Sequence, residues 1–168
     1  VILGGTGPVG VASAVICAKA GANVTLVGRS LEKAEKIAGI CNDRYDSKNV
    51  KGGADADKSD FFNAADIVLN TGAAGIQLMS EEHIKNSNTL KICADTNAVP
   101  PSGIAGVDVM DNGKVIDMSP SKCLGIGALA IGNIKYKSQH ECLKLMYTSE
   151  KPVYLDFEDA FKFAQKSV

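Results

Sequence analysis

The chain has 168 residues, of which 45% are hydrophobic, 22% charged and 5% aromatic. This composition is typical of one folded domain with a sizeable core, and it excludes an intrinsically disordered chain. The 18 basic residues are balanced by 19 acidic ones, so no basic field would attract nucleic acid or an anionic membrane surface. No uncharged stretch is long enough to cross a bilayer. We therefore expect a single cytoplasmic α/β domain over residues 1–168, with no nucleic-acid or membrane partner.

Short apolar segments alternate with helical patterns along the chain. Strands are expected over residues 1–3, 23–27, 67–69 and 90–94, with a further short strand near Val50. Helices are expected from Val9 to Gly21, over 31–40 with Ser30 as N-cap, around Phe61, after Ser80 with acids in the first turn, and over 125–147. A last helix is expected after Asp156 as its cap, with an apolar face made by Phe157, Ala160, Phe161 and Ala164. Residues 42–60 otherwise carry few ordering signals, and Asn112-Gly113 predicts a hairpin between strands over 107–109 and 114–118. The alternation predicts a mostly parallel sheet with helices on both faces.

A glycine-rich turn follows the first strand directly, in the sequence Gly4-Gly5-Thr6-Gly7-Pro8-Val9-Gly10. The spacing Gly5-x-Gly7-x-x-Gly10, between a strand and a helix, is typical of dinucleotide-binding sites. Gly5 would allow the tight turn, Gly7 the close approach of a pyrophosphate, and Gly10 the packing of helix against strand. Pro8 suits the first helical turn, whose free N–H groups would face the phosphates. The turn predicts a doubly wound, Rossmann-type fold, the alternative being a strand–helix turn that binds nothing.

The end of the second strand indicates which dinucleotide is bound. NAD-binding sites usually place Asp or Glu there, where it binds the ribose 2′-hydroxyl. This chain has Arg29 instead, whose guanidinium can bind a 2′-phosphate together with the Ser30 hydroxyl and with Lys33 one turn further on. NADP is therefore the expected cofactor, although Arg29 and Lys33 could also be solvated cations on a surface helix.

The chain resembles the NADP-binding domain of the methylene-tetrahydromethanopterin dehydrogenases, which are related to the methylene-tetrahydrofolate dehydrogenases. The stretches that carry the resemblance are VILGGTGPVG, VGRSLEKA, NTGAAGIQL, ADTNAVPPSGIAGVD and GALAIGNIKYKSQHECL. Such enzymes transfer a hydride from the methylene bridge of a reduced pterin to NADP. The resemblance therefore implies an oxidoreductase with a pterin substrate, whose carrier is methanopterin or folate.

The resemblance also implies the roles of individual residues. Thr6, Gly7, Pro8 and Val9 would line the pyrophosphate, Arg29, Ser30 and Lys33 the 2′-phosphate, and Asn70, Thr71, Gly72 and Ala73 the cofactor beyond the next strand. Asp95 and Asn97 leave their strand at its carboxyl end, where open α/β sheets bind ligands. Asp95 would lie on the nicotinamide side or, alternatively, would bind nearby N–H groups as a strand-end carboxylate. Lys135 would be the catalytic residue that orients the pterin, or else an ordinary surface lysine.

Members of that family carry an N-terminal domain that forms much of the pterin pocket, whereas this chain begins at Val1 inside the first strand. We therefore expect the chain as given to bind cofactor without turning over substrate. Two other functions remain open: an NADP dehydrogenase of the shikimate-dehydrogenase type, and a nucleotide-binding module without chemistry. Apolar surface near the C-terminus also predicts self-association into a homo-oligomer.

The five cysteines and two histidines show no metal-binding spacing, so no metal site is expected. An odd number of cysteines without a CxxC pair favours reduced thiols. Cys17 and Cys93 lie in apolar runs and are expected to be buried. Cys123 is a candidate nucleophile, although no histidine lies near it in the sequence.

Overall fold

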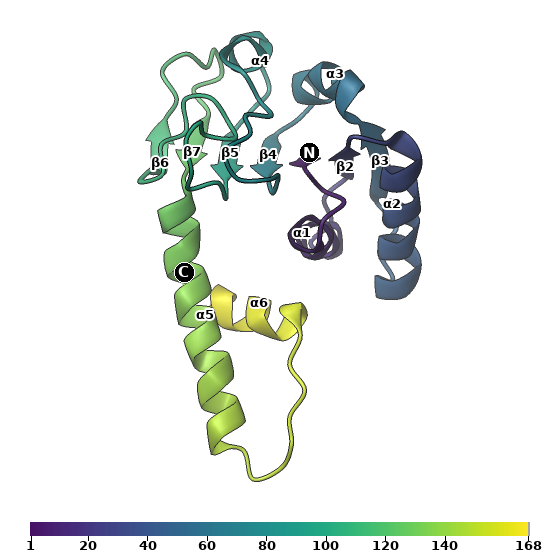
Figure 1. Cartoon of the computed structure of the whole chain (residues 1–168), viewed down its shortest axis with the longest axis vertical. Coiled ribbons are helices and arrows are strands. Elements are labelled where there is room, and N and C mark those ends of the chain that lie inside the picture. Colours follow the sequence, from purple (N-terminus) through teal and green to yellow (C-terminus); the bar gives the residue numbers. More distant parts are fainter. Residues whose placement is uncertain (168) are drawn as a thin grey trace.

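A seven-stranded sheet forms the centre of the computed structural model, which describes residues 1–167 (Figure 1). The strands are β1 (Ile2–Leu3), β2 (Val24–Gly28), β3 (Val50–Ala54), β4 (Ile67–Asn70), β5 (Ile92–Asp95), β6 (Asn112–Val115) and β7 (Leu124–Ile126), in the order β3-β2-β1-β4-β5-β7-β6. Every neighbouring pair is parallel except β6 and β7. The chain passes from β3 at one side of β1 to β4 at the other, and such a switch point is where open sheets bind ligands. The predicted doubly wound, mostly parallel α/β fold is confirmed.

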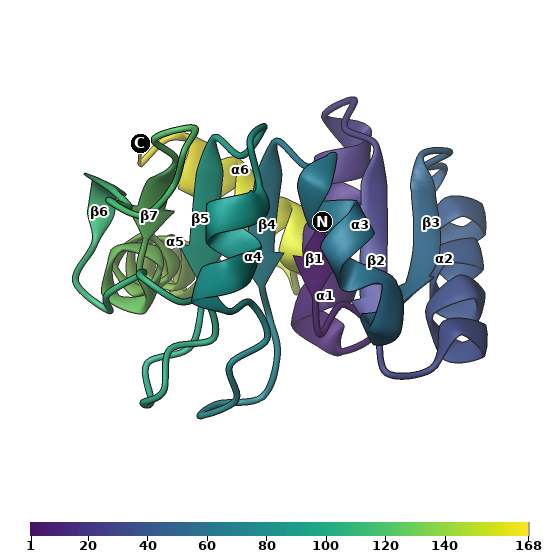
Figure 2. The same ribbon diagram turned by 90° about the horizontal axis from the view of Figure 1, so that it is seen from above.

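Helices cover both faces of the sheet. They are α1 (Pro8–Lys19), α2 (Leu31–Tyr45), α3 (Lys58–Asn63), α4 (Glu81–Asn86), α5 (Ala128–Thr148) and α6 (Phe157–Gln165), with a 3-10 turn over Asp55–Asp57. Figure 2 shows α3 and α4 in front of the sheet and α1 and α6 behind it, with α2 beside β3. Leu3 and Val27 belong to the core on the α3–α4 side, whereas Ile2 and Leu26 belong to the core on the α1–α2 side. Because side chains alternate across a strand, β1 contributes to both cores.

The segment before β3 is more ordered than its polar composition predicts. The helix α2 continues to Tyr45 and ends at Asp46, which has a φ of 50°. The Asn42 side chain then closes the turn into β3, since its Nδ2 donates to Val50 O at 2.8 Å and its Oδ1 accepts from Val50 N at 3.2 Å. Side-chain hydrogen bonds thus order a segment that has little apolar patterning, and the short strand predicted near Val50 is confirmed.

The predicted hairpin between residues 107–109 and 114–118 is wrong. Residues 112–115 form β6, and their partner is β7, which follows them in the chain. The register of this pair shifts between Asn112 and Lys114, where Gly113 has a φ of 81°. The Asn112-Gly113 pair therefore lies at a β-bulge or similar irregularity within β6. A glycine with a positive φ, such as Gly113, is suited to a bulge as well as to a tight turn.

The long helix predicted over residues 125–147 begins at Ala128 instead, because Leu124–Ile126 extend the parallel sheet as β7. Gly127 is the N-cap of α5, with φ −90° and ψ 170°. A short apolar run fits a buried strand as well as a helix, so periodicity does not separate the two. Figure 1 shows α5 running away from the sheet and α6 lying beside it on the return. No helix among residues 1–167 is both long enough and apolar enough to span a membrane.

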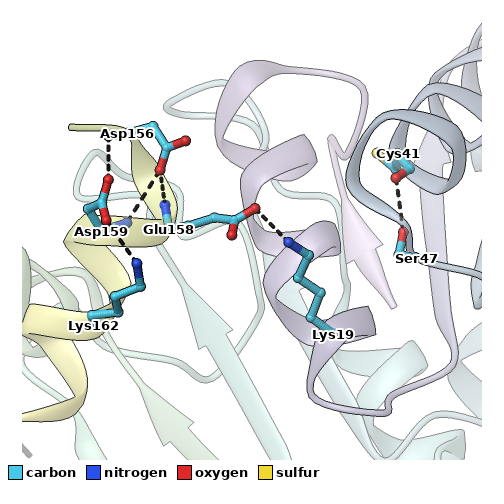
Figure 3. A network of polar contacts seen from close by, with 7 residues as sticks. All are labelled: Lys19, Cys41, Ser47, Asp156, Glu158, Asp159 and Lys162. Carbon is cyan, nitrogen blue, oxygen red and sulfur yellow. Dashed lines mark hydrogen bonds and ion pairs between the residues drawn. The ribbon is translucent and has the colours of Figure 1, made fainter. Parts of the chain in front are cut away.

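The final helix begins at Asp156, as predicted, and is fastened to the α1–α2 layer. The Asp156 carboxylate accepts a hydrogen bond from the Glu158 N–H at 2.9 Å (Figure 3). The Glu158 carboxylate in turn pairs with the Lys19 ammonium of α1 at 2.7 Å. Phe157 meets Tyr45 of α2 edge-on, with ring centroids 5.4 Å apart. An ion pair to α1 and an aromatic contact to α2 therefore help to hold the return of the chain from α5, beside the packing of Phe157 against the core on this side of the sheet.

Candidate functional site

The glycine-rich turn joins β1 to α1 at the carboxyl edge of the sheet. A Cβ at Gly10 would lie 2.5 Å from Gly5 Cα, so only glycine lets α1 approach the turn this closely, as the motif predicts. The bend itself uses Gly4, whose φ is +63°, and not Gly5. The motif spacing pointed to Gly5 because Gly4 lies outside it.

The N-terminus of α1 is open to an anion. Its N-cap is Gly7, which offers no side-chain acceptor, and its first turn contains Pro8 and no acidic residue. Side chains cap α2, α4 and α6, each of which carries an acid in its first turn, whereas α5 resembles α1 in having a glycine N-cap and no acid there. The nearest atom to a Cβ built on Gly7 would be Gly4 O, at 3.7 Å, so there is space beside the turn. An uncapped helix N-terminus has unpaired N–H groups and a positive potential, which suits a phosphate. Thr6 beside it is half-buried and Val9 is exposed.

Arg29 and Ser30 follow β2 at the same edge, and Lys33 lies in the first turn of α2; all three are exposed. The Ser30 Oγ accepts from the Lys33 N–H at 3.3 Å, which confirms Ser30 as the N-cap of α2. That bond uses an oxygen lone pair and not the hydroxyl proton. Neither Arg29 nor Lys33 takes part in an ion pair with any of residues 1–167. Two unpaired cations beside a hydroxyl form a suitable site for a phosphate dianion.

The segment after β4 meets the first glycine turn. The Thr71 backbone N–H and its hydroxyl both donate to Leu3 O, each at 2.9 Å. A Cβ at Gly4 would lie 2.5 Å from Gly72 Cα, so the two turns touch through their backbones. Ala73 is exposed beside them. The structure thus brings together the residues predicted to line the pyrophosphate and those predicted to border the cofactor beyond β4.

Asn70, Asp95 and Asn97 are also brought together, but their side chains are turned inward. These residues are only 0%, 1% and 7% exposed, respectively. The Asp95 carboxylate accepts from Asn70 Nδ2 at 2.7 Å, from Asn97 N at 2.9 Å and from Ile104 N at 3.0 Å. This geometry matches the second expectation for Asp95, a strand-end carboxylate that binds nearby N–H groups.

Lys135 is exposed in the second turn of α5, apart from this buried cluster. Because α5 follows β7, it begins at the carboxyl edge that also carries the glycine turn. Lys137 lines a cleft of about 600 Å³ between α5 and α6, together with Phe163 and Lys166. Lys135 does not line that cleft, so the two lysines face different surroundings.

Cys93 and Cys123 are neighbours in the core, with their sulfur atoms 3.9 Å apart and with 0% and 1% exposure. Burial, reinforced by Cys123, raises the pKa of the Cys93 thiol well above its usual range. Burial likewise removes Cys123 from any substrate, which excludes it as a nucleophile. Cys17 is half-buried, not fully buried as expected. The described part of the chain holds no group of three or more His, Cys, Asp or Glu residues that could bind a metal.

His83 has a structural role that the sequence did not indicate. Its Nδ1 accepts from the Ser80 N–H at 3.0 Å, while Ser80 Oγ accepts from the His83 N–H at 3.4 Å, so the pair forms a capping box at the start of α4. Burial and, after it, the Lys58 ammonium lower the pKa of His83, against the opposing charges of Glu82 and Asp55. Only the run of acids after Ser80 predicted a helix start here.

Stability is expected to depend on the protonation of His83. Its folded pKa lies below the ordinary value of about 6.5, so the unfolded state binds more protons. Neutral His83 therefore stabilises the folded state above about pH 6.5, and this contribution to the free energy of unfolding is lost as the pH falls through the folded pKa. Urea unfolding should show that the free energy of unfolding decreases as the pH is lowered from 7 to 5. In His83→Gln, which keeps an acceptor for the cap, this dependence of the free energy on pH should be weaker. His140→Gln, at an exposed position of α5 that lines the cleft toward α6, is the control, and an unaltered slope in His83→Gln would refute the assignment.

The strand order β3-β2-β1-β4-β5 and the glycine turn between β1 and α1 define a Rossmann-type dinucleotide-binding domain. Two solved structures share this fold. Quinate dehydrogenase from Corynebacterium glutamicum in complex with NAD has a TM-score of 0.59 and 16% identity, covering 99% of this chain and 54% of that one. An L-alanine dehydrogenase has a TM-score of 0.57 and 15% identity, covering 97% and 52%.

Sequence comparison gives a more particular relationship. The chain is 39% identical over 167 residues to the NAD(P)-dependent methylenetetrahydromethanopterin dehydrogenase of Methylorubrum extorquens, covering 98% of this chain and 56% of the relative. It is 37% identical over 149 residues to the bifunctional protein MdtA of the same organism, covering 87% and 50%. No family model matches the chain. The predicted resemblance is confirmed: the chain is similar in sequence to a methylenetetrahydromethanopterin dehydrogenase over nearly its whole length, and it spans about half the length of the curated relatives it matches.

Proposed function

We propose that this chain is the NADP-binding part of a dehydrogenase that transfers a hydride from the methylene group of methylenetetrahydromethanopterin to NADP. The observation that carries the proposal is the cluster of Arg29, Ser30 and Lys33 at the end of β2, beside the open N-terminus of α1. The relative that is 39% identical is named as an NAD(P)-dependent enzyme for this pterin, which supports the same substrate class here.

Different residues at the carboxyl edge of the sheet would bind different parts of NADP. The N–H groups at the start of α1, with Thr6 and Gly7 before them, would bind the pyrophosphate. The Arg29 guanidinium would bind the 2′-phosphate through two parallel N–H bonds, with the Ser30 hydroxyl and the Lys33 ammonium as further donors. NADP supplies the hydride-accepting ring when bound, so the protein needs only to bind and orient the reactants.

On the substrate side, Lys135 would donate a hydrogen bond to the pterin and orient its methylene carbon. Its position fits this role because α5 starts at the carboxyl edge of the sheet and because the preceding residues, from Gly125 to Ile134, carry no charge. Hydride transfer needs no acid–base pair, so the burial of Cys93 and Cys123 does not oppose an enzyme.

Two other functions make different predictions. A dehydrogenase of the shikimate type would share the fold seen in quinate dehydrogenase, but that likeness, at 16% identity, concerns the fold alone. A nucleotide-binding module would bind NADP and convert nothing.

Calorimetric titration of the 168-residue chain with NADP⁺ and with NAD⁺ tests the cofactor first. We expect tighter binding of NADP⁺, because NAD⁺ lacks the phosphate dianion, and equal affinities would overturn the assignment. NADPH formation by the natural full-length protein is then followed with methylenetetrahydromethanopterin, methylenetetrahydrofolate, shikimate or quinate. Activity with shikimate or quinate alone would favour the second function, and binding without any turnover would favour the module.

A further inference from the structure

The Asp95 carboxylate joins the end of β4 to the loop that follows β5. It lies at the end of β5 and accepts hydrogen bonds from Asn70 at the end of β4, from the Asn97 backbone, and from the Ile104 backbone. Both carboxylate oxygens are used, Oδ1 by Asn70 and Asn97 and Oδ2 by Ile104. Hydrogen bonds to a charged acceptor are among the stronger ones in proteins.

The two asparagines extend this network into the loops over residues 71–79 and 96–105, here called the edge loops. Asn70 Oδ1 accepts from the Gly72 N–H at 3.0 Å. Asn97 Oδ1 accepts from the Gly75 N–H at 3.2 Å and the Val99 N–H at 2.9 Å, and its Nδ2 donates to Pro101 O at 2.8 Å. Asn97 therefore belongs to one edge loop and holds a backbone group of the other.

The edge loops are also joined directly to each other. The N–H groups of Leu78 and Met79 both donate to Gly103 O, at 2.8 Å and 3.0 Å, and the Ala105 N–H donates to Met79 O at 2.8 Å. A Cβ at Gly103 would collide with Asn70 Nδ2, so glycine is required where the second loop crosses the network. Figure 2 shows loops that project together beyond one edge of the sheet, next to β4 and β5.

The strand order determines which half of a dinucleotide these loops meet. The cations for the 2′-phosphate follow β2, and the glycine turn follows β1, whereas the edge loops follow β4 and β5 on the other side of β1. A dinucleotide laid across this edge, with its adenosine end at Arg29 and its pyrophosphate at Gly7, therefore has its nicotinamide end at the edge loops.

We propose that Asp95 is a positioning residue: it touches neither cofactor nor substrate, but its carboxylate holds the two edge loops in the one arrangement that orients the nicotinamide for hydride transfer. At 1% exposure its side chain is closed to a ligand, and its oxygens are already engaged by three donors. Asp95 thus controls the rate of hydride transfer and leaves NADP affinity, which depends on Arg29 and α1, nearly unchanged. This inference rests on the proposed function.

Asp95→Asn is the informative variant because it keeps the shape of the side chain. Whichever way the new amide is turned, its NH₂ group faces an existing N–H donor, either Ile104 or the Asn70–Asn97 pair. In the double variant Asn70→Asp, Asp95→Asn, the carboxylate at position 70 accepts from the amide at position 95, so this one contact is restored with the roles exchanged, while the Asn97 N–H still faces an NH₂ group. Asp111→Asn is the matched control, since Asp111 is also buried, at 6% exposure, and accepts from the Asp108 N–H at 2.8 Å in a different loop.

The first measurement is hydrogen exchange of the backbone amides, with and without NADP⁺, which requires no turnover. In the wild type, we expect slow exchange in both edge loops and further protection by NADP⁺. In Asp95→Asn, exchange should rise at least tenfold in both loops together and the protection by NADP⁺ should be lost there, while protection at α1 persists. Faster exchange in one loop only, or in neither, would overturn the proposal, as would an equal effect of Asp111→Asn on the edge loops.

The second measurement is kinetic, in the natural full-length protein with methylene-deuterated substrate. Asp95→Asn should lower kcat tenfold or more, change the Kd of NADP⁺ less than threefold, and raise the deuterium isotope effect on kcat, since hydride transfer becomes more rate-limiting. The double variant should recover part of kcat. A role in stability alone would leave kcat and the isotope effect of the folded protein unchanged, and this result would refute the proposal. A wild-type protein that binds NADP⁺ but oxidises no methylene pterin would instead refute the proposed function, while the exchange experiment would still decide whether Asp95 holds the loops.

Discussion

Lys135→Ala is expected to lower kcat/KM for the methylene pterin by about 100-fold, the loss typical of a misplaced substrate. The Lys135 ammonium is exposed and forms no ion pair with any residue that the structure describes, so it is available to a ligand. The Kd of NADP⁺ should stay the same, because the 2′-phosphate and pyrophosphate groups would bind at β2 and α1. Steady-state kinetics and calorimetry of the natural full-length protein measure the two quantities separately.

Lys137→Ala is the matched control for this prediction. It removes the same charge two positions further along α5, from a side chain that lines the cleft between α5 and α6. We expect neither kcat/KM nor the Kd of NADP⁺ to change. Wild-type kcat/KM in Lys135→Ala would instead identify Lys135 as an ordinary surface lysine.

Arg29→Asp is expected to reverse the preference of the chain for NADP over NAD. The variant loses charge-assisted bonds to the 2′-phosphate, which contribute about 1.5–3 kcal/mol each, or roughly 10- to 150-fold in affinity. It also places a carboxylate where the phosphate dianion would bind, so repulsion adds to the lost attraction. The affinity for NAD should improve, because an Asp at the end of the second strand can accept a hydrogen bond from the ribose 2′-hydroxyl.

The control for Arg29→Asp is Lys48→Asp, which makes the same change of charge in the exposed turn before β3. That turn lies at the opposite edge of the sheet, since β3 begins where β2 begins. Calorimetric titration of both variants with both cofactors should show a reversed preference in Arg29→Asp alone. A similar loss in the two variants would mean that net charge, and not the Arg29 site, governs NADP affinity.

The features predicted well from the sequence are those encoded by neighbouring residues. The spacing from Gly5 to Gly10 indicated the close packing of α1, and Ser30 indicated the start of α2, because both depend on contacts within a turn or two. The strand end at Arg29 could likewise be located, since a buried apolar strand precedes it directly.

The features that escaped prediction depend on residues far apart in the chain. Asn70 lies 25 positions before Asp95, so no local pattern shows that one side chain binds the other. The assignment of β7 failed for the same reason, because Leu124–Ile126 form a strand only when β5 lies alongside. The Asn112-Gly113 pair suggested a tight turn, but only Gly113 of the two has a positive φ, and the partner strand follows the pair in the chain and does not precede it.

The helix α5 is attached to the sheet at its N-terminal end, here called its root. Its root is held by backbone bonds, from the Gly127 N–H to Asp111 O at 2.8 Å and from the Leu129 N–H to Val109 O at 3.0 Å. Its 21 residues correspond to a rod of about 30 Å, whereas Lys135 lies about 12 Å from the root. If the rod pivots at its root, a displacement of about 5 Å at the far end, near the 91% exposed Tyr147, moves Lys135 by only about 2 Å. The position of Lys135 is therefore less sensitive than that of Tyr147 to a change in the direction of α5, because Lys135 lies closer to the held end.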